Sequence, residues 1–117
     1  MFKKIISTIS LVMLSQSAFS AYAVLTTGAT ISEIASNTGN GQNFFIKVTG
    51  GTGPCTGTSP TLVVFPLSKA GASGNDENLH NRAFTLALTA YSVGDTIEVA
   101  GYDGEDCQTA SRIKVIK

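Results

Sequence analysis

The stretch ENLHNRAFTLALTAYS, residues 77–92, is the one convincing helix in a chain otherwise rich in strand and turn residues. At 100° per residue its apolar side chains gather on one face. One flank of that face holds Leu79, Ala83, Leu86, Ala87 and Ala90. Asp76 suits the positive N-terminal end, and Gly94 suits the position after the last turn. The small alanines predict a helix that packs closely on a sheet.

Segments with strand patterns lie on both sides of this helix in the sequence. They are residues 28–36, 43–49 and 61–65 before it, and residues 96–102 and 112–116 after it. In the second segment Phe44, Ile46 and Val48 fall on one face, which is the period of two expected for a half-buried strand. The first segment changes phase near Glu33, which predicts a bulge. Asn40-Gly41 suits a hairpin turn between the first two strands.

The resulting order is three strands, one helix and two strands. In a small chain this order predicts a mainly β domain, a five-stranded antiparallel OB-like barrel with the helix between strands 3 and 4. The alternative is an α+β arrangement in which the helix lies on an open antiparallel sheet. Residues 24–117 are expected to form this single domain.

The chain has two cysteines, Cys55 and Cys107, which bracket the helix. In an oxidising compartment they allow one pairing. Their spacing does not fit a CxxC redox motif, and one distant histidine is a poor complement for a zinc site. We therefore predict one structural disulfide, which ties the loop entering strand 3 to the loop leaving strand 4.

The N-terminus has the pattern of a secretory signal peptide. Lys3 and Lys4 precede an apolar run over residues 5–14, which is too short to span a membrane. Small residues suitable for cleavage follow, so the cut is expected after Ser20 or after Ala23. Residues 1–23 are therefore assigned to the leader, and the protein is expected to be exported, to the periplasm or beyond the cell.

The charge balance limits the partners. Counted from residue 21, six basic residues face eight acidic ones, a net charge of −2. The basic patch that a nucleic acid or an anionic membrane would need is absent from this composition. No cofactor or metal motif stands out, so we expect a partner that is a glycan or another protein.

Three features are candidates for catalysis or ligand binding. His80 is the only histidine and lies in the apolar arc of the helix, where a half-buried ring bonded to the backbone is the favoured interpretation over a general base. Asp103, Glu105 and Asp106 form an acidic turn, which we interpret as a solvated connection rather than a calcium site. Tyr102, just before that turn, is a candidate platform for a sugar ring.

Several stretches resemble the B subunits of subtilase-cytotoxin and typhoid-toxin type AB5 toxins. They are residues 27–32, 44–48, 53–55 and 81–94, followed by 96–99. The resemblance implies an OB-fold, a core disulfide, ring-shaped homo-oligomers and sialoglycan binding. In that family a serine just before a glycine at the start of the first strand contacts the sugar, and here Thr27 precedes Gly28.

These observations predict a non-enzymatic binding module for a glycan or a protein. The expected ligand-binding residues are Thr27, Tyr102 and Asp103, and the turn at residues 37–42 is a further place to look. The alternative is a periplasmic structural or inhibitory protein that acts through protein contacts alone. A small hydrolase is disfavoured, because one histidine and no paired-carboxylate motif leave little catalytic machinery.

Overall fold

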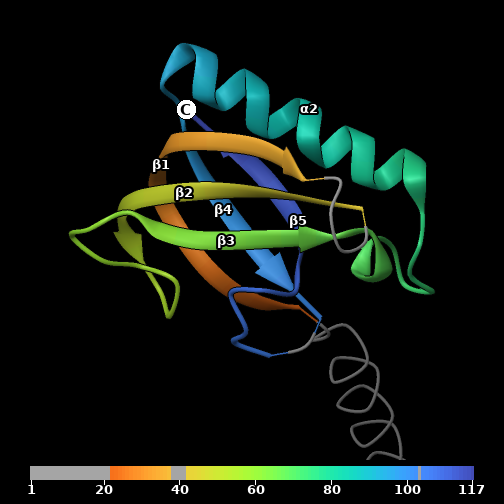
Figure 1. Cartoon of the computed structure of the whole chain (residues 1–117). Coiled ribbons are helices and arrows are strands. Elements are labelled where there is room, and N and C mark those ends of the chain that lie inside the picture. The colour runs from red at the N-terminus through yellow and green to blue at the C-terminus, as the bar shows by residue number, and fades with distance from the viewer. Residues whose placement is uncertain (1–21, 38–41, 103) are drawn as a thin grey trace, which may run out of the picture.

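The computed structural model of this protein describes residues 22–37, 42–102 and 104–117 (Figure 1). In chain order its elements are β1 (Ala23–Asn37), β2 (Asn43–Thr52), β3 (Thr61–Pro66), η1 (Leu67–Lys69), α2 (Glu77–Val93), β4 (Thr96–Gly101) and β5 (Ala110–Ile116). The strands form one antiparallel sheet in the order β3-β2-β1-β4-β5. The predicted mainly β fold with five antiparallel strands and one helix is confirmed.

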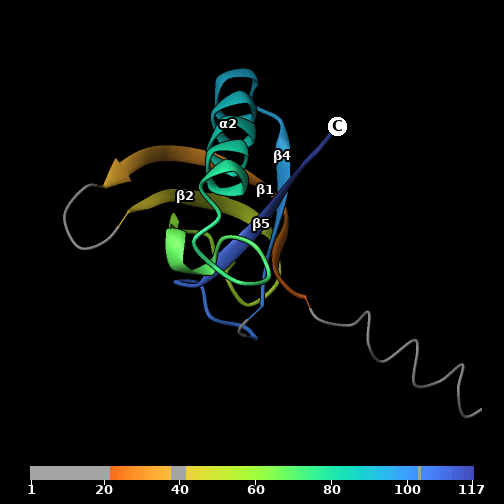
Figure 2. The same ribbon diagram turned by 90° about the vertical axis from the view of Figure 1, so that its right-hand side faces the viewer.

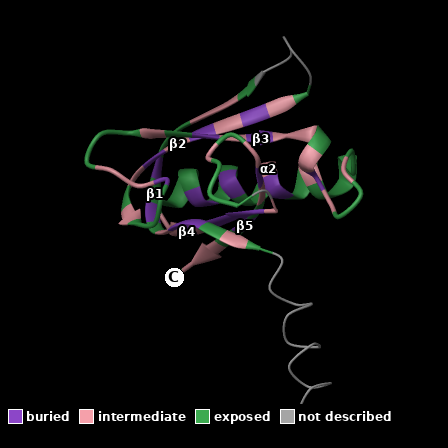
Figure 3. Cartoon of the chain, turned by 90° about the horizontal axis from the view of Figure 1, so that it is seen from below, coloured by how far each residue is buried: buried purple, intermediate pink, exposed green. Residues whose placement is uncertain are grey.

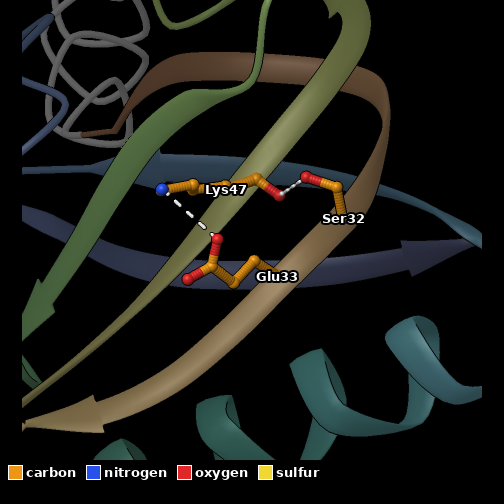
Figure 4. A network of polar contacts seen from close by, with 3 residues as sticks. All are labelled: Ser32, Glu33 and Lys47. Atoms are coloured by element: carbon orange, nitrogen blue, oxygen red, sulfur yellow. Dashed lines mark hydrogen bonds and ion pairs between the residues drawn. The ribbon is translucent and has the colours of Figure 1, made fainter.

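Strand β1 holds the sheet together because it pairs with two neighbours. Its later residues pair with β2, and its earlier residues pair with β4. The register against β2 shifts between Ile31 and Glu33, which confirms the predicted bulge. Beside the shift, the Glu33 carboxylate lies 3.3 Å from the Lys47 ammonium, and Ser32 Oγ donates to the Lys47 carbonyl (Figure 4). Bulges increase strand twist, so the sheet curls around its inner face.

The predicted barrel is not closed, which corrects the finer part of the fold prediction. The sheet is open, with β3 and β5 as its two edges. In the described part of the chain, one backbone hydrogen bond links the β3 edge to the segment before β5, from Val64 N to the Cys107 carbonyl at 2.9 Å. That segment runs as turns, and β3 ends at Pro66, whose nitrogen cannot donate. Among the described residues, β3 and β5 are therefore not paired in a ladder.

The core lies between the inner face of the sheet and α2, which covers one side of the strands (Figure 2). Phe44, Ile46 and Val48 are buried, as the alternating pattern predicted, and along β2 they alternate with residues of intermediate burial (Figure 3). Phe44 stacks on Phe65 with ring centroids 4.5 Å apart. The helix packs mainly on β1 and β5, and it reaches β2 through Phe84, whose ring centroid lies 5.2 Å from that of Phe44.

The helix begins and ends where the sequence indicated. The Asp76 side chain accepts a bond from Leu79 N at 3.1 Å, and Gly94 has a φ of 77°, in the left-handed region. Ala83, Ala87 and Ala90 are the buried helix residues. Leu79 and Leu86, expected on the inner flank, are each 42% exposed. The alanines bring the helix axis close to the sheet, so the larger leucines lie at the margin of the contact.

The disulfide between Cys55 and Cys107 is confirmed, with Cα atoms 5.8 Å apart. Cys55 is fully buried, and its backbone N–H donates to the Leu25 carbonyl at 2.8 Å. The bridge joins the β2–β3 loop to the β4–β5 loop, next to the open side of the sheet. Among the described residues, no helix is long and apolar enough to cross a membrane.

Candidate functional site

Two tyrosines lie side by side where β1 begins and β4 ends. Ala23 pairs with Gly101 in the ladder between these strands, so the preceding Tyr22 and the following Tyr102 are brought alongside each other. Their ring centroids are 4.7 Å apart, and their hydroxyl oxygens are 2.7 Å apart. Tyr22 is 44% exposed. This tyrosine pair presents aromatic surface to solvent from residues separated by 80 positions in the chain.

Strand β5 adds a positive charge to the tyrosine pair. The Arg112 guanidinium carbon lies 5.2 Å from the centroid of the Tyr22 ring, a cation–π arrangement. The hydrogen bond with Tyr22 raises the pKa of the Tyr102 hydroxyl above 10.0, and partial burial adds to this, while the Arg112 charge opposes it. The raised pKa keeps the Tyr102 hydroxyl protonated, so it can donate a hydrogen bond at physiological pH.

The tyrosine pair forms one wall of a hollow of about 310 Å³, which we call the tyrosine groove. Its other residues come from β5, from the start of α2 and from the loop before it: Ser111, Arg112, Ile113, Leu79, Arg82, Ala83, Leu86 and Gly71. The groove combines an apolar floor with two guanidinium groups and two phenol hydroxyls. Its volume is at the lower end of the range for small-ligand pockets.

One polar atom in this region lacks a partner. The Ser111 hydroxyl is buried and makes no hydrogen bond within the described structure. Buried polar groups in proteins are nearly always bonded, and an unbonded one costs stability. Ser111 lines the tyrosine groove, but its hydroxyl oxygen is covered by protein atoms and does not face the open volume.

A second hollow, of about 280 Å³, continues on the other side of Tyr102. It is lined by Tyr102, by Ser68 and Lys69 of η1, and by the loop that follows η1, including Ser73. Gly71 and Tyr102 belong to both hollows. Tyr102 therefore stands between an apolar cationic hollow and a polar one, where a ligand of more than one ring could contact both.

The predicted ligand residues are not brought together. Thr27 lies within β1, opposite Thr52 on one side and Glu98 on the other, and is not a lining residue of either hollow. Asp103 lies outside the described residues, as do residues 38–41 of the predicted turn. Sequence reasoning selected Tyr102 but missed Tyr22, because Tyr22 fell in the segment assigned to the leader.

His80 has a structural position. Its Nε2 atom lies 2.8 Å from the Phe65 carbonyl oxygen, and its ring centroid is 5.1 Å from that of Phe44. This matches the interpretation of a half-buried histidine bonded to the backbone at the edge of the core. Among the described residues, no three acidic, histidine or cysteine side chains are grouped as a metal site.

Comparison with known proteins gives a family. A model described as "Family of unknown function (DUF5992)" matches residues 4–117. The chain belongs to the DUF5992 family. The DUF5992 match spans both the segment expected to be a leader and the whole folded domain. No curated protein and no solved structure matches the chain significantly, so the resemblance of this DUF5992 protein to toxin B subunits stays a prediction.

Proposed function

We propose that this protein is an exported, non-enzymatic binding module whose tyrosine groove holds a sugar-bearing ligand. The observation that carries the proposal is the tyrosine pair, which exposes aromatic surface at the wall of a groove with an apolar floor. Sugars present a C–H face that packs on aromatic rings, while their hydroxyls require hydrogen-bonding groups such as the two phenols.

The charge of the groove favours a particular kind of sugar. Arg82 and Arg112 line it, and its described lining residues include no carboxylate. Guanidinium groups bind carboxylate, sulfate or phosphate groups with paired hydrogen bonds. A glycan with a negatively charged substituent therefore fits this groove better than a neutral one.

The export of the protein and the finer description of the fold belong to the same proposal. The disulfide agrees with an oxidising compartment. The strand order, and the bond from Val64 of the β3 edge to Cys107 in the segment before β5, support an OB-like barrel that is partly open. The resemblance to toxin B subunits implies the same OB-like fold and a sugar ligand. It also implies ring-shaped homo-oligomers.

A second candidate function rests on α2. Leu79, Leu86 and Val93 follow one another at intervals of seven residues, and they are 42%, 42% and 65% exposed. Residues at that interval share one helix face. An exposed apolar stripe of this kind supports a structural or inhibitory protein that acts through protein contacts.

A glycan array probed with the folded protein separates these functions. We expect the wild type to bind glycans that carry a negatively charged substituent. Tyr102→Ala should bind them at least about tenfold more weakly, because it removes an aromatic contact worth roughly 1 kcal/mol and also leaves Tyr22 without its ring and hydroxyl partner. Tyr91→Ala is the control, because it also removes a tyrosine ring, 45% exposed, but from α2 and outside the groove lining.

Two array results would count against the sugar proposal. The first is a folded wild-type protein that binds no glycan. The second is binding lost in Thr27→Ala and unchanged in Tyr102→Ala, which would place the ligand at the position implied by the toxin resemblance. If the array is silent and Val93→Glu abolishes capture of one envelope protein, the protein-contact function replaces the sugar-binding one.

A further inference from the structure

The first described residues of the chain already belong to the folded domain. Ala23 is the first residue of β1 and pairs with Gly101 of β4. Tyr22 bonds to Tyr102 through its hydroxyl and receives the Arg112 guanidinium on its ring. These contacts matter for processing, because one of the two cleavage sites offered by the sequence lies after Ala23.

Cleavage after Ala23 would remove several interactions together. The mature chain would lose the hydrogen bond and the tilted ring contact of the tyrosine pair, together with the cation–π contact between Arg112 and Tyr22. It would also lose the outermost pairing of the β1–β4 ladder and one wall of the tyrosine groove. Cleavage after Ser20 keeps all of these, because Ala21 would be the first residue.

We propose that the leader is removed after Ser20, so that the mature protein begins at Ala21 with Tyr22 as its second residue. Ser20 and Ala18 supply the small side chains that signal peptidases need at the first and third positions before the cut. The contacts of Tyr22 and Ala23 in the folded domain therefore favour the first of the two cleavage sites that the sequence offers. Processing there also creates an α-ammonium group one residue before Tyr22 in the chain.

The proposal is tested on the full chain exported by a bacterial host. The intact mass of the disulfide-bonded product identifies its first residue, because starts at Ala21 and Val24 differ by the three residues Ala-Tyr-Ala. We expect the mass of residues 21–117. A product that begins at Val24, or one that keeps the leader, overturns the proposal.

Two variants make the assignment sharper. Ser20→Leu replaces the small residue before the proposed cut, and we expect the Ala21 terminus to disappear from the product. Ala23→Val is the matched control, since valine suits a strand but not the residue before a cut, and we expect it to be processed at Ala21 like the wild type. The opposite pattern, in which Ala23→Val blocks processing and Ser20→Leu does not, contradicts the proposal.

Discussion

The disulfide between Cys55 and Cys107 should contribute strongly to the free energy of unfolding. Cys55 and Cys107 are 52 residues apart, and the bridge spans the side of the sheet that hydrogen bonds leave open. In the chain-entropy model, closing a loop of this length removes about 14 cal/mol/K from the unfolded chain, or about 4 kcal/mol at 25 °C. A domain of this size has a total stability of roughly 5–14 kcal/mol. The bridge therefore supplies a large share of the free energy of unfolding of the domain.

The test is urea unfolding of the double variant Cys55→Ala/Cys107→Ala. Alanine is chosen over serine because Cys55 is fully buried, and a hydroxyl there would need a hydrogen-bond partner. We expect the free energy of unfolding to fall by about 4 kcal/mol and the slope of the transition to increase, because the unfolded chain without the bridge is more expanded.

Reductant provides the control for this measurement. It should destabilise the wild type to about the level of the double variant, and it should leave the double variant unchanged. A loss below about 1 kcal/mol would refute the reasoning. It would mean that the backbone contacts between the β3 edge and the β4–β5 loop hold this side of the sheet without the covalent link.

Three further predictions concern the sheet and the tyrosine pair. Tyr22→Phe should lower the pKa of Tyr102 toward 10.0 in a site-resolved NMR titration, because it removes the hydrogen bond between the two hydroxyls. In the wild type, the stabilisation from this hydrogen bond is present below pH 10.0 and should disappear as pH rises through the raised pKa. Gly53→Ala should lower the free energy of unfolding by more than about 2 kcal/mol, because its Cβ would lie 2.6 Å from the Leu25 carbonyl oxygen of β1 and its φ is 129°. Gly50→Ala has open space around the new Cβ, so it should lower the free energy of unfolding by about half as much. Ala87→Leu should cost about 1–3 kcal/mol in the same assay, because the residue is fully buried against the sheet.

Local patterns predicted most of the fold. The alternation at Phe44, Ile46 and Val48 identified the buried face of β2, and the period of the helix identified the alanines that pack on the sheet. These features depend on residues a few positions apart. The open side of the sheet could not be predicted in the same way, because closure depends on how two distant edges meet in space.

The site was predicted less completely, for a physical reason. Tyr102 could be selected as an aromatic residue beside a polar turn, but its partners come from distant places in the sequence, Tyr22 from 80 residues earlier and Arg112 from the next strand. Their proximity follows from the β1–β4 and β4–β5 registers, which no local pattern shows. The assignment of residues 1–23 to the leader also hid the start of β1.

The most direct test of the central claim is to map the ligand on the protein. Once the array supplies a sugar, titration into isotope-labelled mature protein should shift the side-chain signals of Arg82 and Arg112 and the signals of Ser111, all of which line the tyrosine groove. The account predicts that the largest shifts fall on these residues and on the tyrosine pair. Shifts concentrated around Thr27, or along the outer face of α2, would contradict it.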